Sequence, residues 1–324
     1  MSLQNDPRRI RPPDRNRALA DPASAGDSAT LEHLLSHVAT VERQLDHVTG
    51  QLRHLEQRDH VLQQGLAKLN QQMARARQLQ DDLLPRSLPE SDSLRISTLY
   101  VPANELSGDV YDVVRLNDRQ LFISISDATG HDMAAALLSI FMKQSLRARE
   151  AVVHQARRSS IEHPHELLSK LNDELVAADL SECHFLTSIH AVFDEVDHNM
   201  LWARGGMPYP ILIRCGEPAQ RIVSEGGLIG AFADQQFDSV STHLGPGDVM
   251  LLFTDGLEAL LLNAGPGAGS GRGAATLLDT PWCRTLTGET LATHLHEIKE
   301  LLSNTSPDDW PADDVTILAL EGIG

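Results

Sequence analysis

The sequence predicts an α+β fold in which a long coiled-coil helix precedes a domain of layered sheets and helices. Two observations lead to this prediction. Apolar residues recur at steps of three and four over residues 31–84, and from about residue 94 the pattern changes to short β-type runs bounded by glycine. Helical patterns are few and clustered there, at about 132–150, 164–178 and 288–302, which favours α+β layers over alternating βαβ units.

The N-terminal part divides at residue 30. Residues 1–30 are rich in Pro, Arg, Asp and Ala and lack periodicity, so we expect them to be disordered. Residues 31–84 fit one heptad register, interrupted at position a by Asp59 and Gln80. Leucine at d predicts a parallel homodimer, and an antiparallel hairpin within one chain is the alternative. Position d holds Leu34, Val41, Val48, Leu55, Leu62, Leu69, Ala76 and Leu83, and position a holds Val38, Leu45, Leu52, Leu66 and Met73.

Residues 85–324 are predicted to form one domain. Pro85 and Pro89 end the helix before it. The glycine-rich stretch 263–276 is expected to be a loop, either a lid or a simple insertion. Strands are predicted at 95–101, 110–115, 120–126, 185–194, 200–204, 211–214, 240–244, 249–254 and 315–320.

Charge and composition exclude several classes of protein. The formal net charge of −18, from 45 acidic and 27 basic residues, argues against a nucleic-acid partner, because a phosphate backbone would repel the chain. The three cysteines lie far apart with no C-x-x-C pair, which indicates a reducing compartment. No secretory signal is apparent and no apolar run approaches the ~20 residues that cross a bilayer, so a cytoplasmic protein without a membrane anchor is expected.

Four aspartates stand at the ends of apolar runs. Asp109 precedes one run, Asp127 and Asp255 each follow one, and Asp313 opens "DDVTILAL" with Asp314 beside it. Strand ends can meet at one edge of a sheet, and carboxylates that meet without basic partners repel one another. A divalent cation relieves this repulsion, and oxygen ligands without paired cysteines favour Mg²⁺ or Mn²⁺.

The order of several motifs resembles a known family. The stretches "QLQDDLLPRSLP", "YVPANELSGDVYD", "ISDATGHDMAAAL", "FLTSIHAVFD", "GGMPYPIL", "GGLIGAF", "GDVMLLFTDGLEA" and "ADDVTILALE" follow one another between about residues 78 and 321. In this order they resemble the PPM-type, metal-dependent protein serine/threonine phosphatases. The similarity is greatest to the bacterial SpoIIE/RsbU-like branch of that family.

This resemblance implies an αββα sandwich with a dinuclear Mn²⁺ or Mg²⁺ centre at one end. It implies that a water activated by the metals attacks a phosphoserine or phosphothreonine, and that His131 is a candidate general acid. The substrate it implies is a phosphorylated STAS-domain protein of a partner-switching pathway. The metal ligands it implies are Asp109, Asp127, the carbonyl of Ala128, Asp255 and Asp313.

Alternatives remain open at this point. Asp132, where the family commonly has glycine, is either a helix cap or a ligand of a third, weaker metal site. A non-catalytic dimeric scaffold could use the same fold to bind a partner, but intact aspartates argue against it. A metal-dependent nuclease could also use clustered aspartates, but the acidic charge argues against that class.

Overall fold

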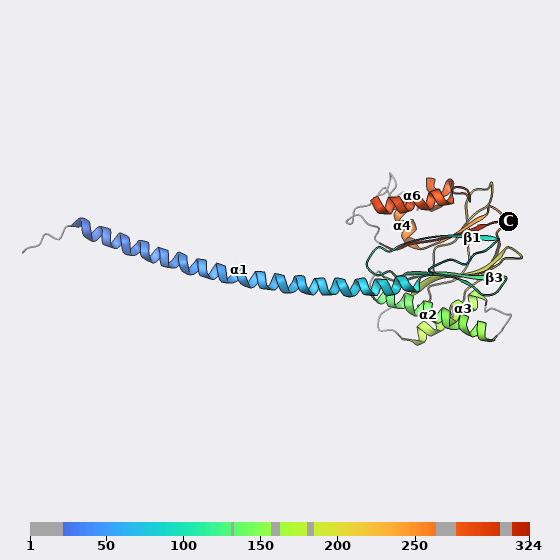
Figure 1. Ribbon diagram of the computed structural model, residues 1–324, viewed down its shortest axis with the longest axis horizontal. Helices are drawn as coiled ribbons and strands as arrows, with labels where there is room; N and C mark the ends of the chain where they lie inside the picture. The colour runs from blue at the N-terminus through green and yellow to red at the C-terminus, as the bar shows by residue number, and fades with distance from the viewer. Residues whose placement is uncertain (1–21, 131–132, 157–162, 180–184, 264–276, 305–312) are drawn as a thin grey trace, which may run out of the picture. The chain divides into compact units, whose positions relative to one another are not determined.

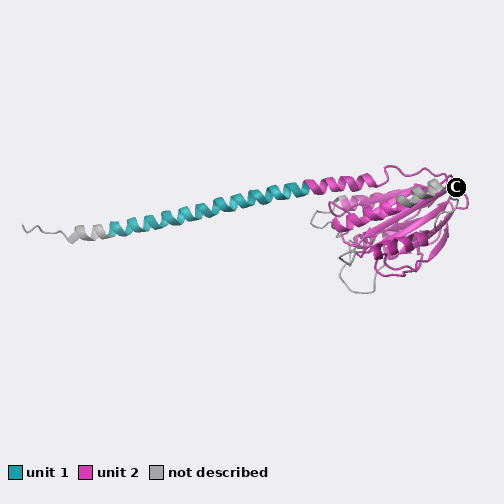
Figure 2. Cartoon of the chain, turned by 90° about the horizontal axis from the view of Figure 1, so that it is seen from below, with its two compact units in different colours: residues 1–70 teal, residues 71–324 magenta. Residues whose placement is uncertain are grey.

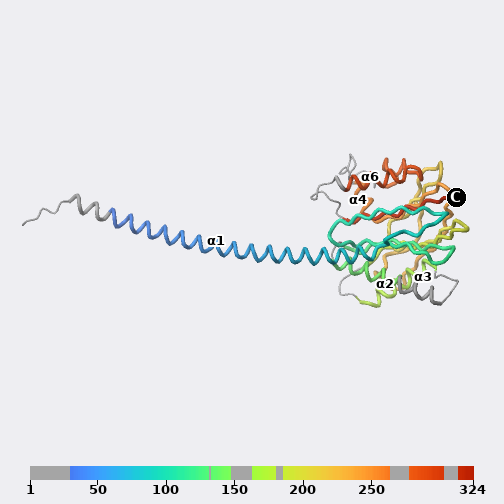
Figure 3. Tube along the Cα trace, in the orientation of Figure 1, coloured from blue at the N-terminus to red at the C-terminus, as the bar shows by residue number. Residues whose placement is uncertain are grey.

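The computed structural model of the chain is shown in Figures 1 and 3. The chain divides into two compact units, residues 1–70 and 71–324, which are coloured separately in Figure 2. The predicted domain boundary at residues 84 and 85 therefore falls inside the second unit. The structure describes residues 22–130, 133–156, 163–179, 185–263, 277–304 and 313–324.

Helix α1 runs from Pro22 to Leu83. It begins earlier than expected, so residues 22–30, which the sequence predicted to be disordered, are helical; residues 1–21 lie outside the described residues. Proline suits the first position of a helix because its missing N–H would have no partner there. The a and d side chains from Leu34 to Leu69 are exposed, from 48% for Val48 to 65% for Leu45. Within the described residues, no helix is both long and apolar enough to span a membrane.

Two antiparallel sheets form the centre of the second unit. The first sheet has the order β1 (Leu94–Val101), β10 (Val315–Gly322), β9 (Val249–Phe253), β6 (Ile211–Ile213) and β7 (Gln220–Arg221). The second has the order β2 (Asp109–Arg115), β3 (Gln120–Ala128), β4 (Leu186–Asp194), β5 (Asn199–Gly205) and β8 (Ser239–His243).

Alternation along the strands builds the layers. In β3, Leu121, Ile123 and Ile125 join the core between the sheets, whereas Phe122 joins the core on the helical side. Figure 1 shows α2 and α3 over the second sheet and α4 and α6 over the first. These four layers confirm the predicted αββα sandwich. The helices are α2 (Met133–Ala156), α3 (Pro164–Ala177), α4 (Asp255–Asn263), the short η1 (Leu277–Asp279) and α5 (Pro281–Arg284), and α6 (Leu291–Asn304).

Most predicted elements are present with shifted ends. The sequence missed the short strand β7, helix α4 and the short helices η1 and α5. α4 follows directly on β9, so the apolar residues of the two elements form one run in the sequence and the helical period is hard to separate. The predicted loop lies, except for Asn263, outside the described residues.

Candidate metal centre

The four predicted aspartates come from both sheets. Asp109 opens β2 and faces Asp127 of β3 across the antiparallel register. Asp255 is the first residue of α4, shortly after β9, and Asp313 lies just before β10. Because β9 and β10 are antiparallel neighbours, the last residues of β9 lie beside the first residues of β10.

Asp109 ties the two sheets together. Its side chain is 1% exposed, and its Oδ2 accepts hydrogen bonds from the hydroxyls of Thr254 at 2.8 Å and Thr316 at 2.5 Å. Thr254 directly follows β9 and Thr316 lies near the start of β10, both in the first sheet, whereas Asp109 opens β2 of the second sheet. The carboxylate is thus oriented by hydroxyl donors that the opposite sheet supplies.

Asp314 has a role that the sequence did not reveal. It is 2% exposed, and its two carboxylate oxygens accept the backbone N–H groups of Ala103 at 2.7 Å and Gly108 at 2.8 Å. Asp313 is half-buried, and its Oδ1 accepts the N–H of Asp314 at 2.9 Å. Of the two adjacent aspartates, Asp314 therefore fixes the loop that leads to Asp109.

Gly108 brings the ends of β2 and β3 close together. A Cβ atom at this position would lie 2.7 Å from the carbonyl oxygen of Ala128 and 3.3 Å from Oδ1 of Asp127. The Ala128 N–H donates to the Gly108 carbonyl at 3.2 Å. Any larger residue would have to displace the Ala128 carbonyl, so glycine is required for this close approach.

Buried negative charge dominates the electrostatics. Burial, followed by the charges of Asp255, Asp313 and Asp314, raises the pKa of Asp127 to about 8. Burial, followed by Asp127 and Asp314, also raises the pKa of Asp109 well above its usual range, although the two threonine hydroxyls act in the opposite direction. The strongest charged neighbours of each carboxyl group are therefore other carboxylates. Such an arrangement favours uptake of a proton or of a cation.

The donor set fits a hard divalent cation, because it consists of carboxylate and carbonyl oxygens. Within the described ranges, no three His, Cys, Asp or Glu side chains already form a group that could hold a metal. Asp109 and Asp127 are register partners in β2 and β3, and the charge of Asp127 helps to raise the pKa of Asp109. His131 and Asp132 lie outside the described residues, so their predicted roles stay predictions.

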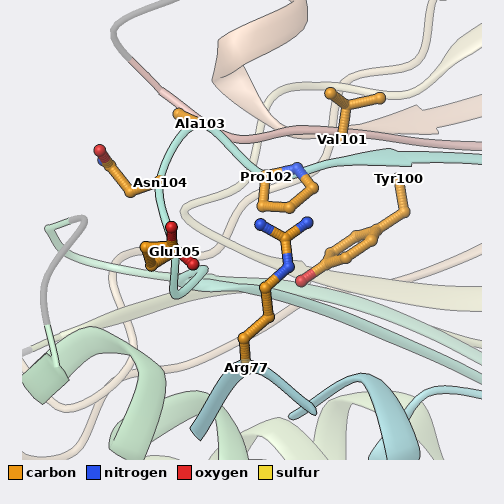
Figure 4. A pocket seen from close by; sticks show the side chains of 7 residues that line it. All are labelled: Arg77, Tyr100, Val101, Pro102, Ala103, Asn104 and Glu105. Carbon is orange, nitrogen blue, oxygen red and sulfur yellow. The ribbon is translucent and has the colours of Figure 1, made fainter. Parts of the chain in front are cut away.

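An open pocket of about 650 Å³ lies beside the β1–β2 loop. In Figure 4 the guanidinium group of Arg77, from α1, reaches toward the hydroxyl end of Tyr100. Burial raises the pKa of Tyr100, and the nearby charges of Asp109 and Asp314 add to this rise. The basic group of this pocket, Arg77, also lies 3.9 Å from Oδ2 of Asp81 on the same helix. The lining of the pocket consists of Arg77, Tyr100, Val101, Pro102, Ala103, Asn104 and Glu105.

A family model described as "Stage II sporulation protein E (SpoIIE)" matches residues 117–322, more than half of the chain. The chain belongs to the SpoIIE family. This confirms the resemblance to the SpoIIE/RsbU-like branch of PPM-type phosphatases. The matched range includes Asp127, Asp255 and Asp313, whereas Asp109 and α1 lie before it.

Two curated relatives of this SpoIIE-family chain come from Bacillus subtilis. Phosphoserine phosphatase RsbU is 26% identical over 183 residues, which cover 56% of this chain and 52% of RsbU. Phosphoserine phosphatase RsbP is 27% identical over 198 residues, which cover 59% of this chain and 46% of RsbP. The chain therefore spans about half the length of these curated relatives.

Solved structures show the same fold. The SiaA-PP2C domain of Pseudomonas aeruginosa superposes with a TM-score of 0.62 at 18% identity, covering 79% of this chain and 98% of that domain. A structure of the PP2C phosphatase domain and a regulatory fragment of SpoIIE from Bacillus subtilis gives a TM-score of 0.53 at 18% identity, with coverage of 72% and 64%. Both likenesses identify the PP2C-type sandwich.

Proposed function

We propose that this chain is a metal-dependent protein serine/threonine phosphatase, which hydrolyses a phosphoserine or phosphothreonine of another protein. The observation that carries the proposal is the convergence of five aspartates, in which Asp109 and Asp314 are buried, Asp127 and Asp313 are half-buried and Asp255 is exposed. Membership of the SpoIIE family and the names of RsbU and RsbP support the same activity.

Two divalent ions, Mn²⁺ or Mg²⁺, would be held at this cluster, with Asp132 as a candidate ligand of a third, weaker site. When bound, such ions supply an activated water for attack on phosphorus and offset the charge of the phosphoryl oxygens. The ligands proposed for the two ions are Asp109, Asp127, the Ala128 carbonyl, Asp255 and Asp313.

Other residues of the chain would prepare the centre. Thr254 and Thr316 fix the orientation of Asp109 through their hydroxyl groups. Asp314 holds the loop before Asp109 through two backbone N–H groups, which leaves its own oxygens occupied. His131 is the proposed general acid that protonates the leaving serine or threonine oxygen.

The proposed substrate is a phosphorylated STAS-domain protein of a partner-switching pathway. This proposal rests on the resemblance to the SpoIIE/RsbU-like branch and on the similarity to RsbU and RsbP. Arg77, which lines the open pocket beside the β1–β2 loop, is suited to attract an anionic phosphorylated side chain, because its guanidinium group pairs well with phosphate oxygens.

A parallel homodimer through residues 31–84 is the proposed assembly. The a and d side chains from Leu34 to Leu69 form an apolar stripe that is about half or more exposed on the single chain. Burying such a stripe against a second copy would remove it from water, which is the main stabilising force of a coiled coil. Leucine at most d positions favours two parallel strands.

The test is hydrolysis by the purified chain. With Mn²⁺ we expect it to release phosphate from a small aryl phosphate and, faster, from a phosphorylated STAS-domain protein. EDTA should abolish both reactions. Activity on neither substrate at saturating Mn²⁺ would instead favour the non-catalytic scaffold. Activity on the small ester alone would retain the phosphatase and remove the STAS-domain substrate.

A further inference from the structure

Gln80 makes an unusual set of contacts for a residue at a predicted coiled-coil core position. Its side chain is 4% exposed within the second unit. Its Nε2 donates to the carbonyl oxygen of Ser107 at 2.6 Å, and its Oε1 accepts the N–H of the same residue at 3.0 Å. One amide side chain thus satisfies both backbone groups of Ser107, as a neighbouring strand would do.

Ser107 in turn determines where Asp109 lies. Ser107 is fully buried, and its Oγ accepts the backbone N–H of Asp109 at 3.1 Å. The residue between them, Gly108, donates its N–H to Asp314. A displacement of the Ser107 backbone would therefore strain two hydrogen bonds, from the Asp109 N–H to Ser107 and from the Gly108 N–H to Asp314. It would shift Asp109, the first residue of β2, as a result.

The same amide also reaches the helix that follows Asp127. Nε2 of Gln80 lies 3.4 Å from Oγ of Ser139, which is in the first part of α2. The Ser139 hydroxyl itself donates to the Ala136 carbonyl at 2.9 Å, so its oxygen can accept from Gln80. Gln80 consequently contacts the segment before Asp109 and the helix after Asp127, while its own backbone belongs to α1.

Neighbouring residues show that the end of α1, which belongs to the second unit, packs by one face against the rest of that unit. Arg77 lines the pocket beside the β1–β2 loop, and Leu84, just after the helix, packs against two of the apolar cores. Residues 77, 80 and 84 are spaced by three and four and so lie on one side of a helical turn. Gln80 is therefore part of this packed face, where its amide pairs with the buried backbone groups of Ser107.

We propose that Gln80 is a positioning residue for the metal centre: it holds the Ser107–Asp109 segment at the place where Asp109 can bind an ion. This inference rests on the proposed function and adds to it. Gln80 touches neither substrate nor ion. Replacing a direct hydrogen-bond partner of a metal ligand typically changes metal affinity or activity by about 10–100-fold, and Gln80 acts on such a partner, Ser107.

The test compares Gln80→Met with Gln78→Met in the full-length chain. Methionine keeps an unbranched side chain of similar length and good helix propensity but loses the amide. Gln78 is exposed on the same helix and serves as the matched control. Mn²⁺ binding is measured directly by titration calorimetry, beside the Mn²⁺ dependence of aryl phosphate hydrolysis and the melting temperature in EDTA.

We expect Gln80→Met to weaken Mn²⁺ binding at least about tenfold, while Gln78→Met binds as the wild type does. Ser107→Ala, which removes the acceptor of the Asp109 N–H, should weaken binding as well. The double variant should lose less than the sum of the two single losses, because both act through Asp109. A merely structural role of Gln80 would lower the melting temperature and leave Mn²⁺ affinity unchanged.

Each outcome bears on a defined claim. Wild-type Mn²⁺ affinity in folded Gln80→Met, or equal losses in both methionine variants, would overturn the positioning role and leave the proposed phosphatase intact. If Gln80→Met does not fold, wild-type affinity in Ser107→Ala would overturn the role. If the wild type binds Mn²⁺ but hydrolyses no phosphate ester, the proposed function fails while the binding comparison still decides the role of Gln80. A wild type that binds no Mn²⁺ would overturn both.

Discussion

Replacing Asp127 by asparagine should stabilise the metal-free protein and abolish its activity. Asp127 is mostly buried among carboxylates, and its pKa is raised from 3.8 to about 8. Below pH 8 the folded state keeps the proton, whereas the unfolded state releases it near pH 4. The folded state then binds more protons than the unfolded state, so stability is greatest at low pH and falls as the pH rises from about 4 to about 8.

The size of this effect follows from the pKa difference. Each pH unit between the two values corresponds to about 1.4 kcal/mol, so a rise from 3.8 to about 8 gives up to about 6 kcal/mol. An asparagine side chain cannot ionise, and the variant should escape most of this loss. At pH 8 in EDTA, Asp127→Asn should therefore resist urea better than the wild type, and the advantage should shrink toward pH 4.

Urea unfolding in EDTA at several pH values measures this difference. Trp202 is a suitable fluorescent probe because it is fully buried in the core between the sheets. Asp238→Asn removes an exposed carboxylate and serves as the control. Added Mn²⁺ should stabilise the wild type and have little effect on Asp127→Asn. A wild-type stability that does not change between pH 5 and 8, or a variant no more stable than the wild type at pH 8, would refute the reasoning.

Three further predictions follow from other residues. Asp255→Asn should lose nearly all phosphatase activity but stay folded, with a melting temperature in EDTA no lower than that of the wild type, because Asp255 is exposed and its charge repels Asp127; near-normal turnover at saturating Mn²⁺ would contradict its role as a ligand. The full-length chain should sediment as a dimer and residues 71–324 as a monomer; equal oligomeric states would contradict dimerisation through the heptads. Lys143→Met should destabilise the fold by about 3–5 kcal/mol in urea, because it leaves buried Asp112 without the ammonium group 3.2 Å away; a loss below about 1 kcal/mol would contradict this.

The sequence was informative wherever a pattern was local. The apolar runs of β3 and β10 identified strands, and their ends identified Asp127 and Asp313 as site candidates. The heptad period identified α1 but misplaced its start, because "PASAGDSAT" has small polar residues without periodicity and still continues the helix to Pro22.

What the sequence could not show were contacts between distant segments. Asp314 looked like a duplicate of Asp313, and only the fold shows that its oxygens hold Ala103 and Gly108. Gln80 appeared to be a polar defect in a coiled-coil seam, because its partner Ser107 lies 27 residues further along the chain. Thr254 and Thr316 stand close to Asp255 and Asp314 in the sequence, but nothing in that pattern predicts that they bind Asp109. Such pairings depend on register between sheets, which spacing in one sequence does not encode.

The hydrogen bonds from Thr254 and Thr316 to Asp109 have a consequence for how the protein responds to mechanical and thermal stress. Donor and acceptor belong to different sheets, so these hydrogen bonds form only when the two sheets are correctly aligned. If one sheet slid over the other by a fraction of a strand spacing, the carboxylate would lose its donors although every strand remained paired. On heating, phosphatase activity should therefore be lost at a lower temperature than the β-strands are. The orientation of the Asp109 carboxylate would depend directly on the alignment of the two sheets.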